Sequence, residues 1–152
     1  MYPNAISIMD AGRVSEDNLK LASMVDYLVC SKEFAETVTN IKLDGTNYQE
    51  LYDKMREQFS KNIIVTLENQ GCLYSYDEEL RIMPAIEVKT IDSTGAGDIF
   101  HGAFTYGVAS NWDLETILKF SNITAGLSVT KIGSRNSIFE LEEVMKKYDE
   151  FK

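Results

Sequence analysis

The segment from Ile91 to Phe104, IDSTGAGDIFHGAF, places two carboxylates around a stretch that has almost no side-chain bulk. The triplet Gly95, Ala96 and Gly97 precedes an apolar pattern of helical spacing that begins at Ile99. Backbone N–H groups at the start of a helix bind anions, and small residues leave them open to approach. Asp98 would repel a phosphate bound there. Its position therefore favours a base that accepts a proton from an attacking hydroxyl.

Each of these residues, taken singly, also has a purely structural interpretation. Asp92 could form a turn through its side chain, and Asp98 could stabilise the positive end of the helix by about 0.3–1 kcal/mol. Two other phosphate-binding motifs are excluded. The sequence has no G-x-x-x-x-G-K-[ST], and Phe100 stands where the dinucleotide fingerprint requires a third glycine.

Short apolar runs rich in Ile and Val precede this segment at 5–9, 27–30 and 62–67, and they predict buried strands. The spacing of apolar residues from Tyr48 to Phe59 predicts a helix between the second and third strands. This alternation indicates an α/β fold with a mainly parallel sheet. Two further runs, 72–76 and 80–88, predict a hairpin in which Pro84 lies at an edge or a bulge.

The remainder of the chain is predicted to be helical. One helix starts at Ile99, a second follows the N-cap Asp113 over 114–130, and a third contains Leu141 and Tyr148. A sheet with about four strands of the parallel type would leave a long open edge, so we expect something else to cover it.

The composition narrows the class of protein. The 152 residues suit one domain, and the net charge of −9 provides no basic surface for nucleic acid or for an anionic membrane. The first residues lack a secretory leader pattern and no uncharged apolar run reaches about 18 residues, so we expect a cytoplasmic protein that does not span a membrane. Cys30 and Cys72 lie in strand-like runs and are expected to be reduced core residues.

The segment DSTGAGDIFHGAF resembles the C-terminal signature of the ribokinase family, the PfkB-type carbohydrate kinases, which transfer the γ-phosphoryl group of ATP to a sugar hydroxyl. Residues 25–39, 65–74 and 120–138 also resemble segments of that family. The resemblance implies a ribokinase-like, doubly wound, mainly parallel sheet with helices on both faces. It also implies that residues 1–152 are the C-terminal, nucleotide-binding part of such a kinase, without the sugar-binding and lid half.

Carried over by position, the resemblance implies ATP and Mg²⁺ as cofactors, Asp98 as the catalytic base and Gly95, Ala96 and Gly97 as the anion hole. A monovalent-cation loop, for which K⁺ is the candidate, would consist of Asp92, Thr94, Ser128, Lys131, Gly133 and Ser137. The ATP cleft would consist of Ser31, Thr66, Leu67, Glu68, Asn69, Gln70, Gly71, Gly97, Asp98 and Asn122, with Asn122 near the adenine. The structural alternatives are a helix-interior amide for Asn122 and a loop residue for Ser137.

The sequence departs from the family pattern at two places. Ser31 and Phe34 stand where many members have an N-x-x-E pair that organises water around Mg²⁺. A subset of the family that includes ketohexokinase-like enzymes also has Ser-Lys at this place, so the loss of the pair indicates a subgroup more than a loss of activity. Glu68 stands where the family commonly has glycine. We interpret Glu33 and Glu36 as solvated helix charges. His101, the only histidine, is interpreted as a packing or cleft-wall residue without an acid-base role.

Two hypotheses follow. The first is an ATP-dependent sugar kinase, whose partners would be ATP, a sugar, and a missing N-terminal half or a complementary chain. The residues around the motif, HGAF and GSRNSI, fit sugar kinases better than the related pyrimidine and pyridoxal kinases. The second is a truncated, non-catalytic module that folds, forms a homodimer through its open edge, and binds nucleotide weakly or not at all.

Overall fold

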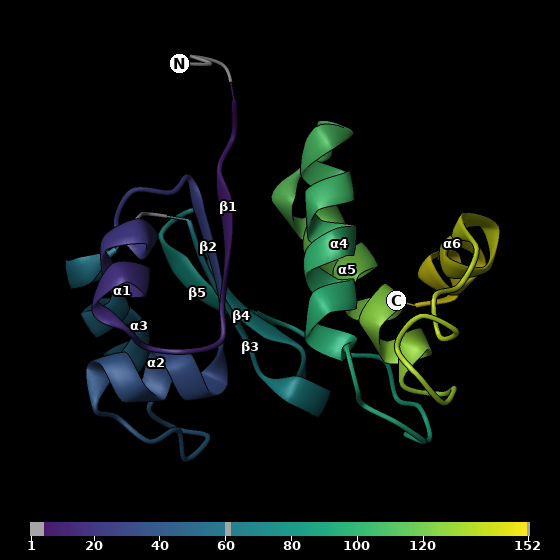
Figure 1. The fold of residues 1–152 in the computed structure, drawn as a ribbon, viewed down its shortest axis with the longest axis horizontal. Coiled ribbons are helices and arrows are strands. Elements are labelled where there is room, and N and C mark those ends of the chain that lie inside the picture. Colours follow the sequence, from purple (N-terminus) through teal and green to yellow (C-terminus); the bar gives the residue numbers. More distant parts are fainter. Residues whose placement is uncertain (1–4, 60–61, 152) are drawn as a thin grey trace. The chain divides into compact units, whose positions relative to one another are not determined.

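The computed structural model describes residues 5–59 and 62–151, which form two compact units (Figure 1). The first unit comprises Met1–Leu67 and Leu73–Arg81, and the second comprises Glu68–Cys72 and Ile82–Lys152.

A five-stranded sheet has the order β1-β2-β3-β4-β5. Parallel pairing joins β1 (Ile8–Ala11) to β2 (Tyr27–Ser31) and β2 to β3 (Ile63–Thr66). The mainly parallel sheet predicted from the alternation of strands and helices is therefore confirmed. The register places Ala11 opposite Cys30 and Ser31 opposite Thr66. The carboxyl ends of these three strands therefore lie side by side at the same end of the sheet.

The first strand begins later than the sequence predicts, at Ile8 instead of residue 5. Ser7 is occupied by other bonds, because its backbone oxygen accepts the N–H groups of Asp26 and Tyr27 while its own N–H and hydroxyl donate to the Asp26 carboxylate. These bonds hold the pKa of Asp26 below its usual range. The strand starts where this junction ends.

Three helices belong to the first unit: α1 (Glu16–Ala22), α2 (Lys32–Thr39) and α3 (Tyr48–Gln58). Serine side chains cap two of them, since Ser15 accepts the N–H of Asn18 and Ser31 accepts the N–H of Phe34. The α2 helix ends at Asn40, whose φ of 55° is left-handed.

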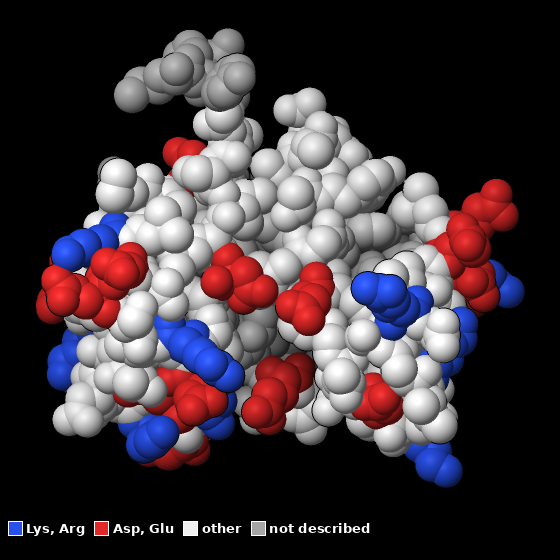
Figure 2. All heavy atoms as spheres, viewed as in Figure 1, with Lys and Arg blue, Asp and Glu red and all other residues white. Residues whose placement is uncertain are grey.

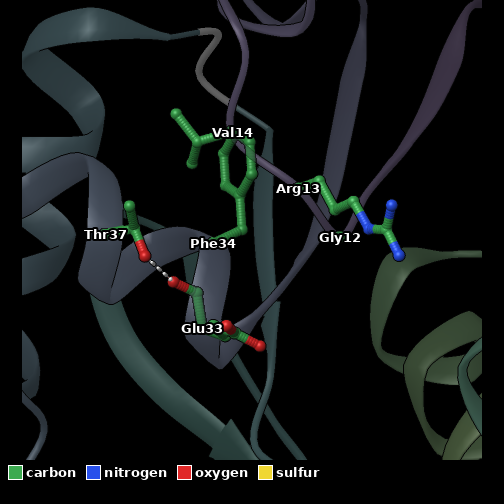
Figure 3. A pocket seen from close by; sticks show the side chains of 6 residues that line it. All are labelled: Gly12, Arg13, Val14, Glu33, Phe34 and Thr37. Carbon is green, nitrogen blue, oxygen red and sulfur yellow. Dashed lines mark hydrogen bonds between the residues drawn. The ribbon is translucent and has the colours of Figure 1, made fainter.

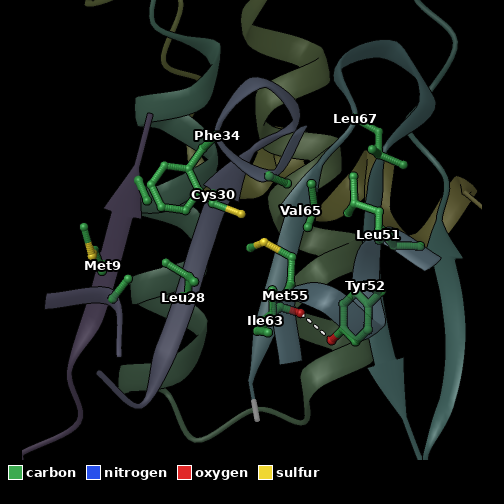
Figure 4. Packing of buried hydrophobic residues seen from close by; sticks show 14 of the residues in the cluster. Met9, Leu28, Cys30, Phe34, Leu51, Tyr52, Met55, Ile63, Val65 and Leu67 are labelled. Carbon is green, nitrogen blue, oxygen red and sulfur yellow. Dashed lines mark hydrogen bonds between the residues drawn. The ribbon is translucent and has the colours of Figure 1, made fainter. Parts of the chain in front are cut away.

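The core of the first unit joins alternate residues of the strands to the buried faces of α2 and α3 (Figure 4). Leu28 and Cys30 of β2 point into it, together with Phe34, Leu51 and Met55 of the helices. The hydroxyl of the buried Tyr52 donates to the backbone oxygen of Ile63, as the dashed line in Figure 4 marks. Val29 and Ile64, which point to the opposite face of the sheet, are buried as well.

The predicted hairpin is present. The strands β4 (Cys72–Tyr76) and β5 (Glu79–Met83) are joined by Asp77 and Glu78, both with positive φ, as a tight two-residue hairpin turn requires. The second strand is shorter than the predicted run 80–88, because Pro84 has no N–H to continue the ladder.

The second unit contains α4 (Ala96–Ala109), α5 (Leu114–Ser128) and α6 (Leu141–Glu150). The predicted N-cap Asp113 is confirmed, since its carboxylate accepts the N–H of Thr116. The helices α4 and α5 approach each other closely at Gly107, where an added Cβ would lie 2.8 Å from the Ile117 side chain. An edge-to-face cluster of Tyr106, Trp112 and Phe120 lies beside this contact.

Two expectations about the whole chain can be compared with the described residues. Cys30 and Cys72 are free and buried, as predicted. Burial raises the pKa of the Cys72 thiol to about 12. In the described part of the chain, no helix is both long and apolar enough to cross a bilayer.

Candidate functional site

The loop before α4 is organised by the Asp92 carboxylate. One oxygen of this carboxylate accepts the N–H of Thr94 at 2.9 Å, and the other accepts the N–H of Gly133 at 2.9 Å. The backbone N–H groups of Ile91 and Asp92 donate to the oxygen of Val129, just after α5. The bond from Gly133 is the main cause that lowers the pKa of Asp92. Asp92 thus ties two loops together, 41 residues apart in sequence.

The helix α4 begins at Ala96, three residues earlier than the apolar pattern predicts. Gly95 is its N-cap with a φ of 79°, and the two small residues that follow continue directly into helical geometry. A Cβ on Gly95 would lie 2.6 Å from the Cβ of Ser134. Gly95 therefore meets two requirements at once, a left-handed φ and a close neighbour.

The predicted anion hole can be compared with the hydrogen bonds of this turn. Among the described residues, the N–H of Ala96 donates to Ser93 at 3.2 Å, whereas those of Gly95, Gly97 and Asp98 have no acceptor. Gly97 has open space on its Cα, since nothing lies within 4 Å of an added Cβ. The turn presents the unpaired amides and positive dipole end that favour an anion.

Asp98 is exposed in the first turn of α4, beside these amides. His101 lies one turn further along, where its Nδ1 is 2.8 Å from the backbone oxygen of Gly97. Because a carbonyl oxygen only accepts, Nδ1 carries the proton in this contact. The ring of Phe100 packs edge-on to the imidazole. These contacts agree with the packing role expected for His101.

The remaining residues of the predicted cation loop follow α5. Ser128 and Ser137 are buried, and their hydroxyls donate to the backbone oxygens of Ala125 and Ser134. The Nζ of Lys131 lies 3.6 Å from the centre of the Phe139 ring. Only the backbone of Lys131 is therefore left to take part in the predicted loop.

The turn at residues 68–71 has two different backbone constraints. Glu68 is exposed and has a φ of 56°, a left-handed conformation that glycine adopts readily and glutamate does not. Gly71 has a φ of 103°, and a Cβ there would lie 1.9 Å from the backbone oxygen of Met83. The departure from glycine at Glu68 thus falls on a residue with a glycine-like conformation. Asn69 and Gln70 complete the turn at the surface.

Asn122 is held by the backbone that follows β5. Its Nδ2 donates to the oxygen of Met83 at 2.9 Å and to that of Pro84 at 3.3 Å, and it lies 3.6 Å from the Cys72 sulfur. The side chain is only 5% exposed. This geometry is the helix-interior amide of the structural alternative, and it anchors the segment against which Gly71 packs.

The remaining predicted ATP contacts lie in the first unit. Ser31 of β2 and Thr66 of β3 lie opposite each other in the register. They lie at the carboxyl ends of the strands, where ligands bind in parallel sheets. The Ser31 hydroxyl caps α2, and the Thr66 hydroxyl donates to the Cys30 oxygen at 3.3 Å. Leu67 is 2% exposed and its side chain belongs to the core, so only its backbone could meet a nucleotide.

The acidic residues of α2 differ from each other, and the expectation that both are solvated is wrong for Glu36. Glu36 is 8% exposed, pairs with Lys42 at 2.9 Å and accepts the N–H of Leu43. The Lys42 hydrogen bond is the main cause that lowers its pKa. Glu33 is exposed and has no ion pair within the described residues. Phe34, in the position of the missing carboxylate, is buried in the core.

One group of residues at the carboxyl ends of the strands was not predicted as part of a site. Gly12, Arg13 and Val14 follow β1 directly and, with residues of α2, line a pocket. The available signal was DAGR immediately after a predicted strand, because ligand sites gather at the carboxyl ends of parallel strands. Within residues 5–59 and 62–151, no three side chains of His, Cys, Asp or Glu are placed to hold one metal ion.

The chain belongs to the pfkB family of carbohydrate kinases, whose sequence pattern matches residues 4–140. The ribokinase of Lactococcus lactis is 30% identical over 149 residues, which is 97% of this chain and 47% of that protein. The ribokinase structure from Thermotoga maritima matches with a TM-score of 0.82 and 29% identity, over 98% of this chain and 50% of that one.

The ribokinase-like fold is thereby confirmed. An Arabidopsis thaliana ribokinase, determined with ribose and ATP, has the same fold at a TM-score of 0.83 and 23% identity, over 93% of this chain and 46% of that one. The chain spans about half the length of the relatives it matches.

Proposed function

We propose that this chain is the nucleotide-binding part of an ATP-dependent carbohydrate kinase that transfers the γ-phosphoryl group to a sugar hydroxyl. The observation that carries the proposal is the first turn of α4. There the unpaired amides of Gly97 and Asp98 stand beside the exposed Asp98 carboxylate. An anion site next to an accessible base is the arrangement that phosphoryl transfer to a hydroxyl needs.

The roles within this turn follow from their contacts. The amides of Gly95 and Gly97 would bind the transferring phosphoryl group, and Asp98 would orient the hydroxyl and accept its proton. Ala96 is the weaker contributor, because its N–H already donates to Ser93. Asp92 would not act as the base, since both of its oxygens accept hydrogen bonds from backbone N–H groups.

The ATP cleft would contain Ser31, Thr66 and the exposed turn at Glu68, Asn69 and Gln70, together with the backbone of Leu67. Gly71 and Asn122 would support the turn at residues 68–70, because both contact the backbone at Met83. Mg²⁺ would neutralise phosphate charge during transfer. Among the described residues, no three His, Cys, Asp or Glu side chains lie together, so in this proposal Mg²⁺ is carried mainly by phosphates and water.

A K⁺ ion would be held by oxygen donors of the loops that flank the anion hole. The candidates are the Asp92 carboxylate, the Ser137 hydroxyl and the backbone oxygens of Thr94, Ser128, Lys131 and Gly133. Support comes from the bond that draws Gly133 onto Asp92 and closes the loop. A cation there would brace the turn at Gly95.

Asp98→Asn tests the proposal. In an assembly that includes a sugar-binding part, phosphoryl transfer should fall by about 10²–10⁴-fold, while the affinity for ATP with Mg²⁺, measured by calorimetry, stays within a factor of about three. Asp149→Asn, on the exposed side of α6, removes the same charge elsewhere and should leave both quantities unchanged. An Asp98→Asn protein that kept most of its transfer rate would remove Asp98 from the mechanism.

A second candidate function, a self-associating module without catalysis, is favoured by one observation. Among the described strands, β1 pairs only with β2, so its other side is an edge of the sheet. Sedimentation of the chain, combined with calorimetric titration of ATP and Mg²⁺, separates the two candidates. A stable homodimer that takes up no nucleotide would favour the module.

A further inference from the structure

The imidazole of His101 donates a hydrogen bond within its own helix. Its Nδ1 lies 2.8 Å from the backbone oxygen of Gly97, four residues earlier in α4. The α-helical pattern directs the backbone N–H of His101 to the same oxygen. The Gly97 oxygen, which has two lone pairs, can therefore accept one hydrogen bond from the backbone and a second from the ring.

This oxygen belongs to the same peptide unit as the N–H of Asp98. A peptide unit is delocalised, so a hydrogen bond to its oxygen draws electron density away from its nitrogen and makes the N–H a stronger donor. Within the described residues, the Asp98 N–H has no acceptor, and it is one of the amides presented by the first turn of α4. The His101 ring is thus connected to this amide through a single peptide unit.

Packing fixes the ring where this hydrogen bond requires it. The rings of Phe100 and His101 meet nearly edge-on, with 6.1 Å between their centres and 70° between their planes. Phe100 is itself buried and stacks on Phe104. The imidazole is half-buried beside them. The donor at Nδ1 is therefore held in place before any ligand binds.

The charged side chains give an anion at this turn little general attraction. Figure 2 shows Lys and Arg interspersed with Asp and Glu, without a broad basic patch, and the net charge of the chain is −9. In the loop that Asp92 ties to this turn, the Nζ of Lys131 is engaged with the Phe139 ring. An anion at the first turn of α4 therefore depends strongly on the local amides.

We propose that His101 is a positioning residue that strengthens the Asp98 N–H as a donor to the transferring phosphoryl group. This inference rests on the proposed function. A neighbouring hydrogen bond strengthens a donor by about 10–30%, and a single oxyanion donor contributes about 10²–10³-fold to kcat, so the ring should contribute about two- to eightfold. A donor matched to the transition state changes kcat more than the KM for ATP.

Two variants of nearly equal shape separate hydrogen-bond donation from packing. The hydroxyl of a helical threonine can donate to the backbone oxygen four residues earlier, whereas valine has no such donor. The chain already contains this bond in α2, where Thr37 donates to the backbone oxygen of Glu33 at 2.7 Å, as the dashed line in Figure 3 marks. His101→Thr therefore keeps a donor to Gly97 that His101→Val lacks.

The first test measures phosphoryl transfer in an assembly that includes a sugar-binding part. His101→Val should lower kcat by about two- to eightfold and leave the KM for ATP within about twofold, and His101→Thr should recover most of the loss. Thr124→Val is the matched control, because it removes the same kind of bond, to the Phe120 oxygen at 2.7 Å in α5, and should leave kcat unchanged. Equal kcat values for His101→Val and His101→Thr would overturn the inference.

The second test needs no activity, because it observes the peptide unit directly. In the chain labelled with ¹³C and ¹⁵N, the carbonyl resonance of Gly97 should lie at lower field in His101→Thr than in His101→Val, since an accepted hydrogen bond deshields the carbonyl carbon. Both variants lack the aromatic ring, so its magnetic effect does not enter the comparison. Identical Gly97 resonances in the two variants would contradict the proposed connection.

This inference and the proposed function fail separately. Phosphoryl transfer at the same rate in His101→Val and His101→Thr would keep the kinase and remove the role of His101. Gly97 resonances that differ between the variants, with no phosphoryl transfer in any assembly, would keep the polarised peptide unit but remove the kinase and the phosphoryl group as its acceptor. Circular dichroism of each variant checks that the helices are intact, so that a lower rate is not lost structure.

Discussion

Gly95 and Glu68 occupy similar left-handed turns but differ in residue type. Their φ angles are 79° and 56°, and each lies beside a segment proposed to meet the nucleotide. A Cβ on Gly95 would lie 2.6 Å from Ser134, whereas Glu68 is exposed. The comparison indicates that lack of space, more than a positive φ, makes glycine indispensable, since backbone strain alone costs only about 1–2 kcal/mol.

Gly71→Ala should have the largest effect. Its φ of 103° is unfavourable for alanine, and the added Cβ would lie 1.9 Å from the backbone oxygen of Met83. The free energy of unfolding should fall by about 3–5 kcal/mol, measured by urea denaturation. Gly45→Ala is the matched control, because its φ is 92° with nothing within 4 Å. Equal losses for the two variants would contradict the importance of space.

Gly95→Ala should destabilise the chain by about 2–3 kcal/mol, because it combines the strain with contact against Ser134. Gly97→Ala, two residues later, has a helical φ and open space. It should instead stabilise by about 0.5–1 kcal/mol through helix propensity. Thermal unfolding of the two variants measures the difference, and a Gly95→Ala variant as stable as wild type would break the comparison.

Asp92→Asn tests the loop that holds Ser134 near Gly95. The variant should unfold at a lower temperature than wild type at neutral pH, because asparagine cannot accept both N–H groups with a full charge. The folded-state pKa of Asp92 is lowered, so its ionised form stabilises the fold above the unfolded pKa of about 3.9. This contribution is lost as the pH falls through the lower, folded pKa. The difference in melting temperature should therefore shrink below about pH 4, and a difference independent of pH would contradict the role of charge.

Glu68→Gly should have the smallest effect, and in the opposite direction. Relief of the left-handed strain is offset by the greater entropy of glycine in the unfolded chain, which leaves a gain of about 0.5 kcal/mol. Glu68→Ala removes the charge but keeps the Cβ, so its stability should match that of wild type. Calorimetric titration of ATP into both variants shows separately whether the Glu68 charge weakens nucleotide binding.

Much of the fold could be predicted from the sequence because apolar periodicity marks buried faces. The strands at 27–30 and 62–67, the Asp113 cap and the hairpin follow from such patterns or from turn residues. The start of β1 could not be predicted, since it depends on the bonds between Ser7 and Asp26, 19 residues apart. The early start of α4 was not predicted from the sequence, because small residues do not contribute to apolar periodicity.

The candidate site was predicted less completely. Local spacing identified the turn at Gly95 and Asp98, and family likeness supplied the other positions. The inward packing of Leu67 and the pairing of Glu36 with Lys42 depend on tertiary contacts that no local pattern encodes. Arg13 was overlooked because a single arginine after a strand has no periodicity to mark it.

Trp112 turns the aromatic cluster of the second unit into an optical reporter. It is the only tryptophan, and its ring lies 5.1 Å from that of Phe120 and 5.5 Å from that of Tyr106. Its fluorescence during denaturation follows the second unit alone, whereas circular dichroism follows both. Comparing the two signals in one experiment would determine whether the units unfold as one cooperative block.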